Sequence, residues 1–194
     1  AIQSAGFYPD RPENTTGDWF YDGRTRLSDW AGSLERFPLS VDPEQGYLAS
    51  ANQQPYDPDD VSDYIGADWP SPWRALTING LLRSKDDHTA ADLEAYQTFP
   101  SGARSVTFHA VFMEAVEQLR ASGAVTPELE EVADLLGEWN LEYTPDNTRA
   151  VLFEAIMSAM QRGIWDELDN SDGRRVATPG TDITWALLDQ PNSP

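Results

Sequence analysis

The stretch SPWRALTINGLLRS, residues 71–84, is where the sequence pattern changes along the chain. Its large apolar side chains recur near the spacing of one helical face. They are Trp73, Leu76, Ile78, Leu81 and Leu82. This spacing predicts a helix from about Pro72 to about Leu82, and the segments on its two sides follow different patterns.

The residues before this stretch predict an irregular, β-rich part. The first 60 residues are rich in Gly, Pro, Asp, Asn, Ser and Tyr, and their apolar runs are short. Two such runs are RFPLSV (36–41) and GYLASA (46–51). This composition is typical of short strands joined by long loops, which we expect over about residues 1–65.

The residues after it predict a block of four or five helices over about residues 70–170. Thr89 and Asp92 form a capping-box-like pair at the start of one helix, and Thr126 precedes Pro127 at the start of another. Between them, the stretch ARSVTFHAVFMEAVEQLRASG predicts a long helix that ends at Gly123. The last helix begins at about Asn147. The chain is therefore expected to be α+β.

The two longest predicted helices each carry an apolar stripe, expected to face the core. The first stripe is Val106, Val111, Phe112, Ala115, Val116 and Leu119. The second is Val151, Leu152, Ile156, Met160 and Ile164. A methionine in such a stripe indicates core packing rather than a cofactor site.

Length and composition indicate one folded domain or a piece of a larger one. The chain has 194 residues, of which 40% are apolar and 11% aromatic, so its composition is not that of a disordered protein. It has no cysteine, which excludes disulfides, thiolate zinc sites and thiol nucleophiles. No apolar run approaches the roughly 18 residues of a membrane span, so we expect no membrane insertion and any targeting signal to lie outside these residues.

The charge is strongly acidic. There are 33 acidic residues against 13 basic ones, giving a formal net charge of −20, and Lys85 is the single lysine. Nucleic acids and anionic membrane surfaces would repel such a chain and are not expected as partners. The acid excess is consistent with a halophilic source, because salt screens the repulsion between like charges.

The residues contain no complete catalytic apparatus of a common kind. His88 and His109 are the only histidines, and neither has metal-ligand spacing or a nucleophilic serine beside it. We expect His109 in the core and His88 in a solvated, charged turn. No Gly-rich phosphate loop, zinc pattern or Gly-x-Ser-x-Gly motif is present, and no organic cofactor is expected.

One block nevertheless has a recognisable order: GYLASANQQP (46–55), an acidic Tyr-rich loop, then a Trp-x-x-x-x-Arg-Ala helix start at 69–75. It resembles the penicillin acylase family of N-terminal-nucleophile hydrolases. AGFYPDRP (5–12) and WAGSLERFPLSVDPEQGY (30–47) resemble the loops before this block. HTAADLEAYQ, LLGEWN, DNTRAVLF and IWDEL follow in the family's order, so the resemblance covers nearly the whole chain.

The resemblance implies a fragment of an αββα fold, from inside the large (β) chain of an autoproteolytically processed amidase. In this family an N-terminal serine attacks an amide with its own α-amino group as the base. The family's oxyanion-binding asparagine falls on Asn52, whose side-chain NH₂ is a neutral donor. Gln53 and Gln54 gain no role from the resemblance and are expected only to form the polar exit of a strand.

Two further residues take implied roles. The family's active-site arginine falls on Arg74, where a guanidinium could orient Asn52. A family aspartate that helps bind a structural calcium falls on Asp63, within the acidic stretch DPDDVSD (57–63).

The residues alone leave alternatives open. Asn52 could simply cap a turn before Pro55, Arg74 could be a structural ion-pair partner, and the aspartates could form a solvated loop. The alternatives at the level of function are a non-catalytic binding or structural module on the same scaffold and a calcium-dependent acidic surface protein.

The resemblance also sets expectations for the whole protein. Residues 1–194 are expected to form part of one domain that lacks the nucleophile segment and a C-terminal continuation, because Ala1 has no nucleophilic side chain. Such a piece would be inactive alone and would need the α chain and the rest of the β chain. A small N-acyl amide is the implied substrate, and the periplasm or the cell exterior the implied location.

Overall fold

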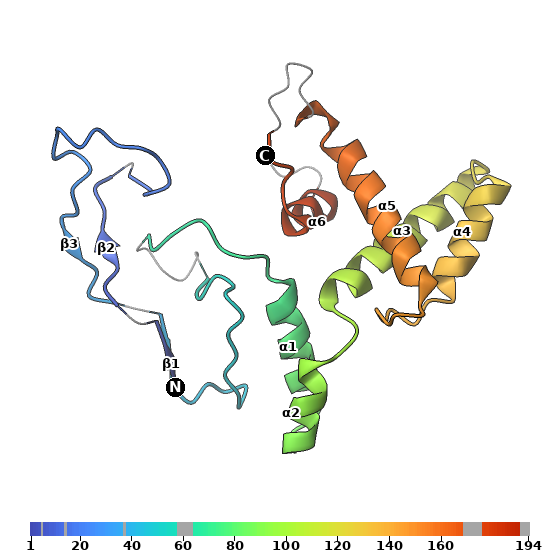
Figure 1. The fold of residues 1–194 in the computed structure, drawn as a ribbon, viewed down its shortest axis with the longest axis horizontal. Coiled ribbons are helices and arrows are strands. Elements are labelled where there is room, and N and C mark those ends of the chain that lie inside the picture. Colours follow the sequence, from blue (N-terminus) through green and yellow to red (C-terminus); the bar gives the residue numbers. More distant parts are fainter. Residues whose placement is uncertain (5, 14, 37, 58–63, 169–175, 191–194) are drawn as a thin grey trace. The chain divides into compact units, whose positions relative to one another are not determined.

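The computed structural model describes residues 1–4, 6–13, 15–36, 38–57, 64–168 and 176–190. The chain divides into two compact units, Ala1–Ala75 and Leu76–Pro194. The described residues contain four very short strands, all in the first unit, and six α-helices (Figure 1). This mixed content confirms the α+β class. The prediction of one domain stays a prediction.

The strands form two antiparallel two-stranded sheets in the first unit. β1 (Ile2–Gln3) pairs with β4 (Leu39–Ser40), and β2 (Pro9–Asp10) pairs with β3 (Gly32–Ser33). Residue 2 faces residue 40 and residue 10 faces residue 32, so the register is the same in both ladders. The two ladders are separate two-stranded sheets with the same register, and β2 and β3 are joined through residues 11–31.

The expected strand over residues 46–51 is wrong. This segment is fully described and forms no ladder. An extended segment becomes a strand only when a neighbouring strand pairs with its backbone N–H and C=O groups, and no strand among the described residues pairs with this segment. Ala51, at the end of this segment, is only 6% exposed.

The helices begin and end close to the predicted residues. They are α1 (Trp73–Arg83), α2 (Ala90–Gln97), α3 (Ala103–Ser122), α4 (Pro127–Gly137), α5 (Thr148–Ile164) and α6 (Thr181–Asp189). A short 3₁₀ helix, η1 (Asp166–Leu168), follows α5. The sequence did not predict α6, which lies beyond the expected helical block. No helix in the described part of the chain is both long and apolar enough to cross a bilayer.

The helix boundaries follow from local capping. The Thr126 hydroxyl accepts a hydrogen bond from Leu129 N at 3.3 Å at the start of α4, and Asn147 caps α5 in the same way. At the end of α3, Gly123 has φ +71°, the left-handed conformation that glycine adopts without steric cost. These short-range signals explain why the boundaries could be predicted.

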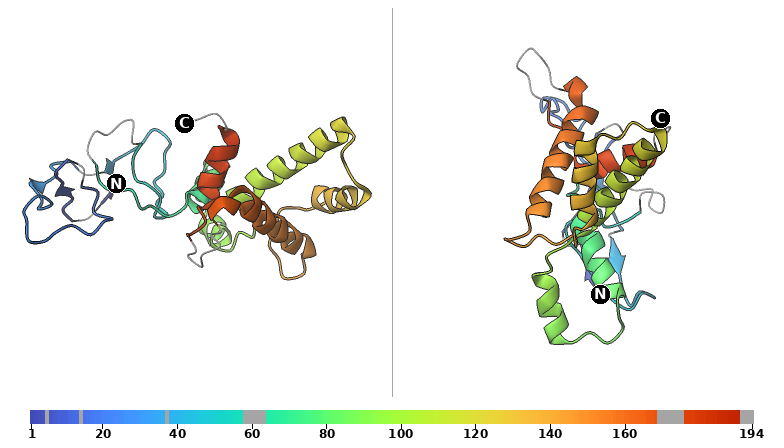
Figure 2. Two further views of the ribbon diagram at one scale, coloured as in Figure 1. Left: turned by 90° about the horizontal axis from the view of Figure 1, so that it is seen from above. Right: turned by 90° about the vertical axis from the view of Figure 1, so that its right-hand side faces the viewer.

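The core of the second unit lies among α3, α4 and α5, where α4 packs against both α3 and α5 (Figure 2). Phe153 is fully buried, with its ring 4.9 Å from that of Trp139 and 5.6 Å from that of Phe112. Phe108 is also fully buried. Burying a phenylalanine side chain contributes roughly 1.5–3 kcal/mol, so each of these two buried rings stabilises the second unit.

The predicted apolar stripes are partly wrong. On α5 the buried residues are Ala150, Phe153 and Met157, whereas Val151 is 72% exposed. The buried face is therefore rotated from the predicted stripe, because the large rings pack around Trp139. On α3, Val116 is buried as expected, but Val106 is 51% exposed.

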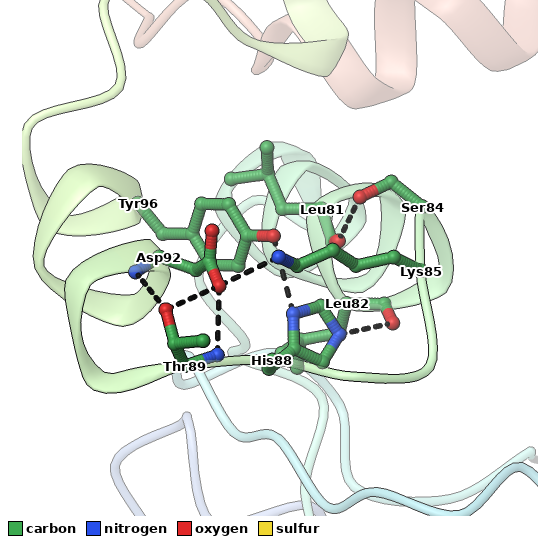
Figure 3. Close-up of polar contacts among 8 residues, drawn as sticks. All are labelled: Leu81, Leu82, Ser84, Lys85, His88, Thr89, Asp92 and Tyr96. Carbon is green, nitrogen blue, oxygen red and sulfur yellow. Dashed lines mark hydrogen bonds and ion pairs between the residues drawn. The ribbon is translucent and has the colours of Figure 1, made fainter.

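A polar network joins α1 to α2 (Figure 3). The Asp92 carboxylate accepts from Lys85 Nζ at 2.6 Å and from the backbone N–H and hydroxyl of Thr89 at 2.7 and 2.6 Å. Thr89 Oγ1 in turn accepts from Asp92 N, which completes the predicted capping box. This network fixes the start of α2 and ties it to Lys85, two residues after the end of α1.

Candidate functional site

Asn52 and Arg74 meet in the first unit, although 22 residues separate them. Arg74 lies in the first turn of α1, and one of its nitrogens, Nη2, donates to Asn52 Oδ1 at 2.5 Å. The same Nη2 donates to the carbonyl oxygen of Ala51 at 2.9 Å. A terminal guanidinium nitrogen carries two hydrogens, so both bonds can form at once. Arg74 therefore binds both the side chain of Asn52 and the backbone before it.

Asn52 has a φ of +64°, in the left-handed region. Asparagine tolerates this conformation better than most residues, because its short polar side chain can form local hydrogen bonds. Segment 47–53 is neither helix nor strand, so side-chain contacts hold this backbone instead of a ladder.

The contact with Arg74 also fixes which end of the Asn52 amide faces outward. Arginine has only donors, so the oxygen of the amide must face it. Asn52 is exposed, and among the residues that the structure describes none accepts a hydrogen bond from its Nδ2. The NH₂ end of the Asn52 amide, which is a neutral donor, is therefore the end that points away from Arg74.

Gln53 contributes a contact that the sequence did not indicate. Its Oε1 accepts a hydrogen bond from Ala51 N at 2.7 Å. Local motifs of this kind are expected from Asp, Asn, Ser and Thr, whose short side chains reach their own backbone. Glutamine has no such established pattern, so no sequence signal could have identified the bond.

A cavity of about 360 Å³ lies between the β1–β4 ladder and the segment that carries Asn52. Gln53 and Ser50 belong to its lining, whereas Asn52 does not. The donor end of Asn52 thus does not line this cavity.

The expected calcium ligand Asp63 lies outside the described residues, as do Asp59 and Asp60. Across the described ranges, no group of three or more His, Asp or Glu side chains could hold a metal ion. The calcium expectation therefore stays a prediction.

Both histidines make structural contacts within the second unit. His109 Nε2 lies 2.9 Å from the carbonyl oxygen of Leu136, and its ring meets Trp139 edge to face. His88 lies 3.0 Å from the carbonyl oxygen of Leu82 and 3.2 Å from the Tyr96 hydroxyl. His109 is part-buried, in agreement with the prediction, and His88 is likewise part-buried, in the turn between α1 and α2 (Figure 3).

Comparison with protein families gives a match to the model described as penicillin amidase, over residues 1–194. The matched range includes the Asn52–Arg74 contact, and it agrees with the resemblance carried by the Ala-Asn and Arg-Ala motifs. Because every residue lies within the match, the chain belongs to the penicillin amidase family of acylase-like hydrolases.

Proposed function

We propose that the chain supplies the oxyanion-binding part of an N-acyl amide hydrolase of the β-lactam acylase or acyl-homoserine lactone acylase type. One observation carries the proposal beyond family membership: Arg74 binds both Asn52 Oδ1 and the carbonyl oxygen of Ala51. This contact leaves the NH₂ of Asn52 as the outward end of the amide. Arg74 then acts as a positioning residue, because it touches Asn52 rather than substrate.

The proposed reaction begins with a serine outside these 194 residues, at the N-terminus of the processed chain. Its Oγ attacks the carbonyl carbon of the substrate amide, and its α-amino group takes the hydroxyl proton. The π electrons of the carbonyl move to oxygen, and Asn52 Nδ2–H donates to this oxyanion. Breaking the C–N bond expels the amine, which takes up the proton, and water then hydrolyses the acyl ester.

An amide side chain suits this role because its hydrogen bond strengthens as negative charge develops. The donor stabilises the transition state more than the uncharged substrate carbonyl, which is what lowers the barrier. Arg74 contributes by keeping the donor pointed at one position, so that no reorganisation is needed during the reaction.

The remaining parts of the proposal follow from the family. The substrate is a small N-acyl amide, and the partners are the other segments of a processed precursor. Export to the periplasm or the cell exterior, and a structural calcium at Asp63, are proposed on the same ground.

The test is Asn52→Ala in enzyme expressed from the full reading frame, after N-terminal sequencing has confirmed processing to a new terminal serine. We expect kcat for phenylacetyl or long-chain acyl amides to fall by roughly 10²–10³, the usual cost of one oxyanion donor, with little change in KM. Gln54→Ala, at a neighbouring amide, is the matched control and should stay near the wild-type rate. Near wild-type turnover by Asn52→Ala would remove Asn52 from the mechanism, and a precursor without an autoproteolytic junction would contradict the enzyme proposal.

A further inference from the structure

The backbone of Ala51 is held on both sides by side chains. Its N–H donates to Gln53 Oε1 at 2.7 Å, and its carbonyl oxygen accepts from Arg74 Nη2 at 2.9 Å. Ala51 itself is only 6% exposed. Both polar groups of a nearly buried residue are thus satisfied by its neighbours, as such groups require.

This arrangement matters because Ala51 directly precedes Asn52. The direction of the Asn52 side chain depends on the two peptide planes around Ala51 and on the φ of +64° at Asn52. With no ladder over 47–53, rotation of these planes is opposed by the two side-chain bonds. Arg74 restrains the plane after Ala51, and Gln53 restrains the plane before it.

We infer that Gln53 is a positioning residue of the oxyanion site, which acts on Asn52 through the Ala51 peptide. The inference rests on the proposed function of Asn52. Loss of the Gln53 acceptor frees the peptide before Ala51, and the donor at Asn52 then samples orientations away from the oxyanion. Misplacing a catalytic group by about 1 Å can cost as much as 100-fold in rate.

A purely structural role for Gln53 makes a different prediction. If Gln53 only satisfied a part-buried N–H, its loss would lower stability without acting through Asn52. Positioning instead predicts a lower kcat at nearly constant KM, because substrate binding does not depend on this donor to the extent that the transition state does.

The experiment compares Gln53→Met with Gln53→Glu in the mature enzyme. Methionine keeps the chain length but lacks the amide oxygen, whereas glutamate keeps an acceptor oxygen at the same reach. We expect Gln53→Met to lower kcat by roughly tenfold with KM within about twofold, and Gln53→Glu to recover most of the rate. Gln54→Met is the matched control and should remain at the wild-type rate. Should Gln53→Met fail to process, Gln53→Ala, which also lacks the acceptor, takes its place.

The same substitution in the Asn52→Ala background separates the two proposals. If Gln53 acts through Asn52, Gln53→Met has no further effect on kcat there, and the double-mutant cycle is non-additive. An equal loss in both backgrounds, or a wild-type rate for Gln53→Met alone, overturns the inference while the role of Asn52 stands. If Asn52→Ala is itself without effect, the proposed function fails.

Discussion

Asn52 combines a strained backbone with a polar side chain, and each has a separable consequence. A φ of +64° costs a residue with a Cβ roughly 1–2 kcal/mol, and glycine avoids that cost. The donor on Nδ2 is a property of the side chain alone. Strain of this kind occurs at functional sites because the surroundings hold the residue in place, here through Arg74.

Comparing two substitutions at Asn52 should therefore separate its effect on kcat from its effect on the stability of the fold. Asn52→Gly and Asn52→Ala both remove the donor, so both should lose the same factor in kcat. Asn52→Ala should in addition be less stable than Asn52→Gly by about 1 kcal/mol, because alanine adopts the left-handed conformation with strain. Thermal unfolding of the two processed variants measures this difference. Equal stability would show that the positive φ is not maintained in the enzyme.

At the scale of the elements, the sequence predicts where helices begin and end, because these boundaries depend on neighbouring residues. It does not predict which face of a helix is buried, because that depends on residues far along the chain. The caps at Thr89, Thr126 and Gly123 agree with the prediction, because the interacting atoms are only three or four residues apart. The buried face of α5 was misassigned, since Val151 and Phe153 are both apolar and only contact with Trp139 decides between them. α6 carried no capping side chain at Gly180 that could have marked its start.

The candidate site was predictable only in part, and for a similar reason. Nothing local connects Asn52 with Arg74, and the resemblance to the family was what placed the two residues together. The structure shows a hydrogen bond between the two side chains, and their roles in catalysis stay predictions. The bond from Ala51 to Gln53 could not be expected, because it depends on a backbone conformation that the residues do not specify.

The α1–α2 corner depends on the charge of Asp92. The hydrogen bond from Lys85, and then those from the Thr89 hydroxyl and backbone N–H, hold the pKa of Asp92 below its ordinary value. An exposed ion pair alone contributes little, but here the same carboxylate oxygen also completes the capping box. The network should therefore stabilise α2 only while Asp92 is ionised.

This predicts a pH-dependent effect of Asp92→Asn. Because the folded-state pKa is lowered, the stabilisation is complete above the unfolded-state pKa of about 3.9 and is lost as the pH falls below it. We expect wild type to have the higher Tm at pH 7, and the difference from Asp92→Asn to shrink below about pH 4.

The control for this prediction is Lys85→Met, which removes the largest cause of the lowered pKa. In that background the substitution at Asp92 should cost less at pH 7. A difference in Tm that stays constant from pH 7 down to pH 3 would contradict the assigned role of the Asp92 charge.

At the scale of the whole chain, negative charge exceeds what ion pairs can neutralise. With 33 acidic and 13 basic residues, most carboxylates have no basic partner available. Several basic side chains are already engaged with acids, such as Arg104 with Glu154 and Arg120 with Glu130. The unpaired acids repel one another, and this repulsion weakens when salt shortens the Debye length from about 10 Å at 0.1 M to about 3 Å at 1 M.

Replacing three exposed acids by amides should therefore stabilise the protein at low salt only. Asp86→Asn, Glu94→Gln and Glu131→Gln together change the net charge of the chain from −20 to −17, since −20 + 3 = −17. We expect the triple variant to have a higher Tm than wild type at low ionic strength, and the difference to vanish in 1 M NaCl, because screening removes the repulsion that the substitutions relieve. Differential scanning calorimetry of both proteins across a NaCl series measures this difference in Tm. A parallel series in sucrose, which carries no charge, shows how much of the change is a general solvent effect and not screening. If the triple variant has a lower Tm than wild type at low salt, or if the difference in Tm does not change with salt, the acid excess does not destabilise this fold.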